Sequence, residues 1–142
     1  MPRALGSRLE APSPFARRKG GLDRLGQSSG MTEYISVTTT TDDARCAERI
    51  ADLLLEARLA ACVQTDAPIT SRYWWQGKLE VSIEWRLTIK TRRALFAALE
   101  VAIRSVHTYT TPQILATPIV DGNDDYLAWI AEVTADKSGT RR

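Results

Sequence analysis

The longest regular pattern in the chain is a strict alternation of apolar and polar residues from Leu79 to Lys90. Its apolar positions are Leu79, Val81, Ile83, Trp85, Leu87 and Ile89. Period two predicts a β-strand with one buried face and one wet face. At ~3.3 Å per residue such a strand runs about 40 Å, whereas an ordinary strand has roughly 5–6 residues. It outreaches the core of one small domain, so we expect its far end, around Trp85, to be buried against another copy of the chain.

Shorter patterns predict the other elements. Alternation indicates strands over 34–39, 59–65 and 113–120, and the second of these resumes through Trp75. Pro68 interrupts that second strand, which predicts a bulge, a kink or an edge position there. Helical spacing of apolar residues indicates helices over about 43–58, 91–106 and 126–133, with Thr91 as the cap of the second. Gly77 supplies the positive φ for a tight hairpin into the long strand.

The order of these elements is βαββαβ with a C-terminal helix. That order predicts an α+β fold, the ferredoxin-like plait, in which two helices pack on one face of an antiparallel sheet. The other face must be wet or shared, and the aromatic residues of the second and third strands favour sharing. We expect one domain over 33–135, between a disordered N-terminal extension (1–32) and a flexible tail (136–142).

Composition narrows the class of protein. A chain of 142 residues with 44% hydrophobic and 25% charged residues is an ordinary soluble globular protein. No apolar run approaches the ~18–20 residues that span a bilayer. Residues 1–30 carry a net charge of +4, so the remainder of the chain, at −2, is slightly acidic. Cys46 and Cys62 form no CxxC pair or disulfide framework, and no signal peptide is evident, so we expect a reducing, cytoplasmic setting.

Several segments together resemble a known family. They are Leu59-Ala60-Ala61-Cys62-Val63, Ser71-Arg72-Tyr73-Trp74-Trp75-Gln76-Gly77-Lys78-Leu79-Glu80, Glu84 with Ile89-Lys90-Thr91, His107-Thr108-Tyr109-Thr110-Thr111-Pro112-Gln113-Ile114, and Asp125-Tyr126-Leu127-Ala128-Trp129. In this order and spacing they resemble the CutA divalent-cation tolerance family, over about residues 33–133. The resemblance implies a tight homotrimer whose long hairpin strands pair across subunits, with the architecture of PII signalling proteins. It also implies a proposed role in tolerance or binding of divalent metals, copper above all.

Metal binding is the first functional hypothesis, with copper or another divalent cation as the ion. Cys62 and His107 match the family's proposed copper ligands, and thiolate and imidazole are donors that copper prefers. Two ligands are too few for a closed site. The alternative is that Cys62 is a small buried hydrophobe and that His107 is a helix cap or a surface residue. The family's usual His-Pro-Tyr-Glu is His-Thr-Tyr-Thr here.

A signalling role is the second hypothesis. In a trimer, clefts between subunits would expose the polar face of the long strand, on which Glu84 and Lys90 fall at family-typical positions. Lys90 would bind a small anionic ligand as a point charge, with Glu84 as its natural partner. The alternative is that these alternating charges solvate a wet face or bridge subunits.

The remaining aromatic residues are interpreted as assembly anchors. Tyr73, Trp75 and Trp85 are expected at the subunit interface, because aromatic residues are enriched in interface cores. Trp129 would pack the last helix onto the sheet or onto a neighbour. The RNP1 pattern of RNA-recognition modules is absent, so no nucleic-acid partner is expected. With one His, no Gly-x-Ser-x-Gly elbow and no phosphate loop, the chain is not expected to be an enzyme.

Overall fold

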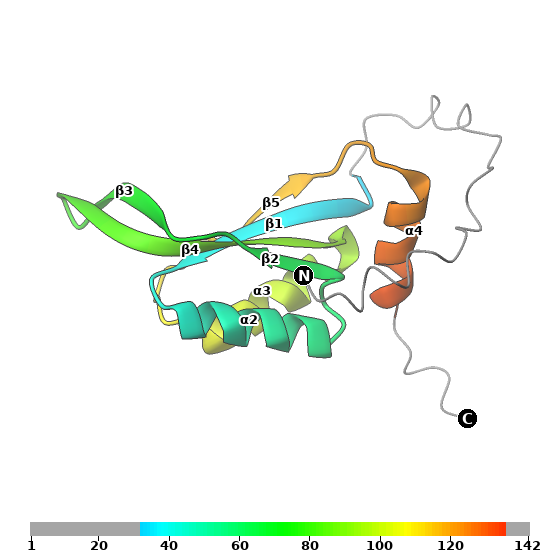
Figure 1. The fold of residues 1–142 in the computed structure, drawn as a ribbon, viewed down its shortest axis with the longest axis horizontal. Coiled ribbons are helices and arrows are strands. Elements are labelled where there is room, and N and C mark those ends of the chain that lie inside the picture. The colour runs from blue at the N-terminus through cyan, green and yellow to red at the C-terminus, as the bar shows by residue number, and fades with distance from the viewer. Residues whose placement is uncertain (1–31, 136–142) are drawn as a thin grey trace.

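The computed structural model describes residues 32–135 (Figure 1). Its elements are β1 (Tyr34–Thr41), α2 (Ala44–Glu56), β2 (Cys62–Thr65), β3 (Ile69–Trp75), β4 (Lys78–Arg92), a 3-10 turn (Arg93–Leu95), α3 (Phe96–Val106), β5 (Leu115–Pro118) and α4 (Asp124–Val133). This order confirms the predicted α+β plait, with the second predicted strand divided into β2 and β3. The predicted N-terminal extension, apart from Thr32, and the predicted tail lie outside the described residues.

The sheet is antiparallel and is organised around β4. Its strands run in the order β2-β4-β1-β5, and β3 pairs with the first half of β4. The second half of β4 lies between β2 and β1, whereas the first half pairs, within the described residues, with β3 alone. The β3–β4 hairpin therefore projects beyond the helices, as Figure 1 shows on its left side. At ~3.3 Å per residue, the 15 residues of β4 span about 50 Å.

A β-bulge separates β2 from β3. Thr65 pairs with Leu87, but Ile69 pairs with Glu84, so three residues on one strand oppose two on the other. The predicted irregularity at Pro68 is therefore confirmed. One extra residue reverses the side to which alternate residues point. The odd-numbered residues of β3 consequently share a face with the even-numbered residues of β4, including Glu84.

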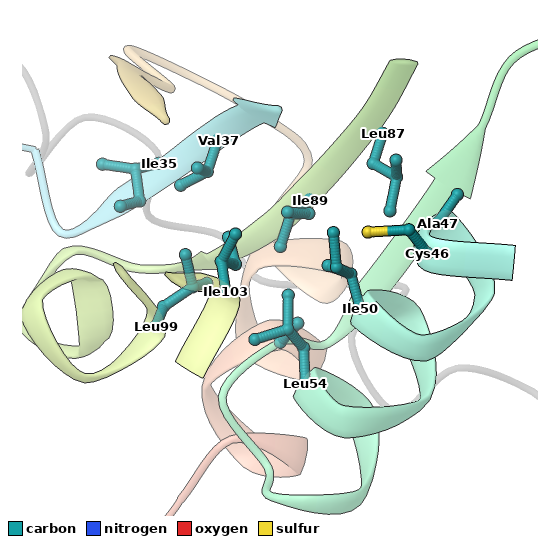
Figure 2. Packing of buried hydrophobic residues seen from close by; sticks show 11 residues of the cluster. Ile35, Val37, Cys46, Ala47, Ile50, Leu54, Leu87, Ile89, Leu99 and Ile103 are labelled. Atoms are coloured by element: carbon teal, nitrogen blue, oxygen red, sulfur yellow. The ribbon is translucent and has the colours of Figure 1, made fainter. Parts of the chain in front are cut away.

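The core lies between the sheet and two helices. Figure 2 shows the side chains of β1, β4, α2 and α3 converging on one cluster. Its fully buried members include Val37, Ile50, Leu54, Leu87, Ile89, Leu99 and Ile103. The start of α2 is stabilised by Asp43, whose carboxylate accepts a 2.9 Å hydrogen bond from the Arg45 amide. Helix α4 is held at the other end of the sheet, where the Arg92 guanidinium donates to the Thr134 hydroxyl and carbonyl at 2.9 and 2.8 Å.

The predicted cap at Thr91 is wrong. Thr91 lies inside β4, and its buried hydroxyl donates a 2.7 Å hydrogen bond to the Leu59 carbonyl, 32 residues earlier in the chain. The strand continues to Arg92, a 3-10 turn follows, and α3 begins only at Phe96. The hydroxyl that looked like a helix cap instead ties β4 to the segment before β2.

The long alternation divides into two parts with different surroundings. Leu87 and Ile89 are fully buried beneath the helices, and Trp85 packs against the same core while remaining partly exposed. Leu79, Val81 and Ile83 continue this face into the projecting hairpin, where each side chain is between 52% and 67% exposed. The apolar face of β4 thus extends beyond the core of its own chain, as the length of the alternation predicted.

Candidate functional site: a cleft beside Glu84

The face of the sheet opposite α2 and α3 carries a cleft of about 710 Å³ where the hairpin leaves the body of the domain. Strand β3 contributes the odd-numbered residues that the bulge turns to this side, and the loop after α3 closes it. The lining residues are Thr40, Ile69, Ser71, Arg72, Tyr73, Trp75, Glu84, Arg86, Thr108, Tyr109, Thr110, Thr111 and Gln113. The cleft therefore depends on the register shift at Pro68, since without it Tyr73 and Trp75 would point to the other side.

Glu84 is the buried charge of this cleft. Only 6% of this β4 residue is exposed. Its Oε2 accepts a 2.8 Å hydrogen bond from the Tyr109 hydroxyl. Within residues 32–135, no other hydrogen bond or ion pair reaches this carboxylate. Burial raises the pKa of the Tyr109 phenol, and the hydrogen bond to Glu84 raises that pKa further. Tyr109 is therefore a neutral donor near neutral pH.

His107 holds the loop that carries Tyr109. The Tyr109 amide donates to Nδ1 of His107 at 3.0 Å, so the ring proton belongs on Nε2, which donates to the Thr40 carbonyl at 2.9 Å. Burial lowers the pKa of His107, against the opposing effects of the Thr40 hydrogen bond and the nearby charges of Asp42 and Glu84. Both ring nitrogens are thus engaged, and the imidazole positions Tyr109 above Glu84.

Cys62 and His107 lie apart in one chain. Cys62 pairs with Lys90, whereas Thr40, the hydrogen-bond partner of His107, pairs with Arg86 on the other side of β4. Four residues along β4 correspond to ~13 Å, and two strand spacings add about 9–10 Å across the sheet. The half-buried Cys62 thiol lies instead beside Tyr126 of α4, where burial and the neighbouring thiol raise the pKa of the Tyr126 phenol.

Metal-binding side chains do not cluster elsewhere in the part of the chain that the structure describes. No group of three or more His, Cys, Asp or Glu residues lies close enough there to hold an ion. The assignment of Cys62 and His107 to copper stays a prediction. Any ion at either residue would need further donors from outside this arrangement.

Lys90 and Glu84 are also separated. They lie six residues apart on β4, which corresponds to ~20 Å, and Lys90 does not line the cleft. Its ammonium group donates to the Gln64 side-chain oxygen instead. The cation beside Glu84 in the cleft is Arg86, whose guanidinium is bound by Asp66 of the bulge at 2.7 Å.

Sequence reasoning did not identify Tyr109 as a partner of Glu84. The two residues are 25 positions apart, and only the path of the loop after α3 brings them together. The sequence could have placed Arg86 near Glu84, because the period-two alternation puts both residues on the same face of the strand. No sequence pattern identified Asp66 as the partner of Arg86, apart from its position near Pro68.

The aromatic residues expected at an interface occupy three different places. Tyr73 and Trp75 line the cleft and are 39% and 46% exposed, and Trp85 packs against its own core. Trp129 lies on α4 with its ring 5.4 Å from that of Tyr126. Trp74 is the most exposed of the four tryptophans, at 70%. Its register partner is Leu79, so both belong to the apolar face of the hairpin.

Known proteins resemble this chain over nearly all of its described part. A model of the family described as CutA1 divalent ion tolerance protein matches residues 35–133. The divalent-cation tolerance protein CutA of Archaeoglobus fulgidus is 48% identical over 102 residues, which cover 72% of this chain and 97% of that protein. Human protein CutA is 41% identical over 138 residues, which cover 97% of this chain and 76% of the human protein.

Solved structures share the fold. The structure of the periplasmic divalent cation tolerance protein CutA from Archaeoglobus fulgidus superimposes with a TM-score of 0.70 at 41% identity, covering 72% of this chain and 99% of that one. CutA1 from the psychrotrophic bacterium Shewanella sp. SIB1 gives a TM-score of 0.72 at 37% identity over 75% of this chain and 99% of that one. Between residues 32 and 135, no helix combines the length and apolar character needed to cross a bilayer.

Proposed function

Because the chain belongs to the CutA1 divalent ion tolerance family, we propose that it acts in the cellular response to divalent cations as a homotrimer. Membership confirms the resemblance seen in the sequence. The matched family and the Archaeoglobus relative are named as divalent ion or cation tolerance proteins and not as an enzyme. A cytoplasmic location stays a prediction, since the Archaeoglobus structure is described as that of a periplasmic protein.

The observation that carries the assembly is the exposed apolar face of the hairpin. Leu79, Val81 and Ile83 stand on one side of β4, beyond the reach of α2 and α3, with Trp74 beside Leu79. Fully burying one such aliphatic side chain contributes roughly 1.5–3 kcal/mol. In a ring of three copies, each copy would cover the hairpin of the next. Because such a ring closes, the apolar face of all three hairpins would be buried.

Light scattering on the full chain tests the assembly. We expect a mass three times the 15.8 kDa of one chain, unchanged on dilution into the low micromolar range. A folded monomer at micromolar concentration would overturn the trimer. The cellular role is tested separately, by expressing the chain in a host deleted for its own CutA and measuring growth in copper. Restored growth supports the role, and growth equal to that of an empty vector contradicts it.

Direct copper binding is a second candidate, supported by the free, half-buried thiol of Cys62. Since Cys62 and His107 lie apart in one chain, a shared site would join Cys62 of one copy with His107 of another, and otherwise each residue would contribute to a site of its own. Calorimetry with Cu(I) and Cu(II) would compare the wild type with Cys62→Ser and with His107→Ala. Loss of binding in one single variant identifies its site, whereas identical titrations exclude both residues as ligands.

The cleft beside Glu84 is the place where we propose that the assembly meets a small ligand, as in a PII-like regulatory trimer. Its volume, its aromatic lining and its buried carboxylate support this proposal. The small anionic ligand expected from the sequence depended on Lys90 acting with Glu84. Their separation of ~20 Å along the strand removes that argument, and the chemistry of the cleft leads to a different ligand.

A further inference from the structure

We infer that the cleft binds a small organic ammonium compound, with Glu84 as the anionic partner and the rings of Tyr73 and Tyr109 beside the cation. This inference rests on the proposal that the cleft is the ligand site of the assembly. It assigns the chemical class of that ligand from three features of the cleft, namely the unfilled hydrogen-bonding capacity of Glu84, the aromatic lining, and the state of the nearby cations.

The first feature is the incomplete partnering of Glu84. A carboxylate can accept about four hydrogen bonds, but within the described residues Glu84 accepts one, from Tyr109. A buried charge is costly unless it is paired and hydrogen-bonded. Because the nine-tenths buried Glu84 lines an open cleft, a ligand can supply the missing donors. An ammonium group brings both the opposite charge and two or three N–H donors.

The second feature is the aromatic lining. Tyr73 points to the same side of the sheet as Glu84, and Tyr109 arrives from the loop after α3. Trp75 lines the far end of the cleft, because its register partner Lys78 is six residues from Glu84. The faces of aromatic rings attract cations, by about 0.5–1 kcal/mol at exposed sites and about 2 kcal/mol or more where water is excluded. These rings also provide apolar surface for the carbon groups attached to the nitrogen. A hydrated metal ion would gain little from such walls.

The third feature is that the cleft offers few suitable groups for binding a metal ion or an anion. A metal ion would find one carboxylate, since the described residues contain no cluster of three potential ligands. An anion would face Glu84 across the cleft. The guanidinium of Arg86 is already bound by Asp66, and Lys90 lies outside the cleft. Arg72 also borders the cleft, but its register partner is Val81, so its side chain points to the other side of the hairpin.

Calorimetric titration of the whole 142-residue chain tests the inference with defined probes. These are propylammonium chloride and tetramethylammonium chloride, compared with sodium chloride and sodium propionate. We expect saturable binding of both ammonium ions and none of the sodium salts. Glu84→Gln keeps the acceptor for Tyr109 but removes the charge. It should weaken propylammonium binding roughly tenfold or more, the factor expected when a hydrogen bond to a charged group is lost.

Glu80→Gln is the matched control, because Glu80 lies on the same side of β4 but does not line the cleft. It should leave binding unchanged, whereas Tyr73→Ala should weaken it. The inference is overturned if neither ammonium ion binds, if Glu84→Gln binds as tightly as the wild type, or if propionate binds instead. It is also overturned if Glu84→Gln only reduces the mass of the assembly, because Glu84 would then face a neighbouring copy.

Light scattering on the same samples distinguishes a failure of the ligand assignment from a failure of the trimeric assembly. A trimer that binds no ammonium ion overturns the ligand class and leaves the assembly standing. A trimer that binds propionate in the cleft keeps the ligand site and replaces its chemistry. A wild-type monomer contradicts the proposed function itself, whatever the titrations give.

Discussion

The Tyr109 hydroxyl donates a 2.8 Å hydrogen bond to the carboxylate of Glu84. The same residue donates its backbone amide to Nδ1 of His107, so it is fixed at both ends. This pair joins the loop after α3 to the strand from which the hairpin projects. It thereby connects the cleft to the element that we propose for assembly.

Removing the phenolic hydroxyl should destabilise the fold. Tyr109→Phe leaves the buried Glu84 carboxylate without its donor, and we expect a loss of about 1–3 kcal/mol in the free energy of unfolding. Urea unfolding measures it, at one fixed chain concentration because assembly contributes to stability. Tyr73→Phe is the control, since among the described residues the Tyr73 hydroxyl accepts only an exposed 3.2 Å hydrogen bond from Ser82. Equal losses in the two variants would contradict the role given to Tyr109.

His107 should titrate below its ordinary pKa of 6.5, because burial disfavours its charged form. In the unfolded chain the imidazole takes up a proton first, so the contribution of His107 to stability is complete above about pH 6.5 and is lost as the pH falls below it. The chain has one histidine, so its NMR titration is unambiguous. A midpoint at or above 6.5 would show that the neutral, doubly hydrogen-bonded ring is not the native state.

The hairpin turn can be improved. Gln76 and Gly77 both have positive φ, at 49° and 79°, the pattern of a type I′ turn, which prefers Asn-Gly. Gln76→Asn should therefore stabilise the protein by less than the ~1–2 kcal/mol that the left-handed conformation costs an ordinary residue, since Asn tolerates that conformation better than Gln. Gly77→Ala should destabilise it by about 1–2 kcal/mol, although no atom lies within 4 Å of the added methyl group. Thermal unfolding of both variants checks the opposite signs.

The sequence predicted those features that depend on local pattern. The alternation from Leu79 identified β4 and its projection beyond the core, because period two needs no knowledge of distant residues. Pro68 marked the bulge, since a missing amide hydrogen disrupts pairing wherever it falls. Gly77 marked the turn, since glycine adopts a positive φ without steric cost. Each of these is a property of neighbouring residues, and the structure confirms each of them.

Features that depend on register were not predictable. Cys62 and His107 were joined because they match the family's proposed copper ligands, but their distance in one chain is set by the pairing of β2 and β1 along β4. Thr91 looked like a helix cap because the carbonyl that accepts its hydrogen bond, on Leu59, is 32 residues away. The lining of the cleft was also hard to predict, since the one extra residue in the bulge decides which side chains of β3 face the cleft.

The most direct test compares two valine substitutions by light scattering. Val81 on the hairpin and Val101 on α3 are similarly exposed in the single chain, at 62% and 70%. The account predicts that Val81→Asp yields a folded chain of monomeric mass, because a charge on the hairpin face cannot be buried in the assembly, while Val101→Asp remains a trimer like the wild type. A stable trimer of Val81→Asp, with a mass unchanged on dilution, would contradict assembly through the hairpin.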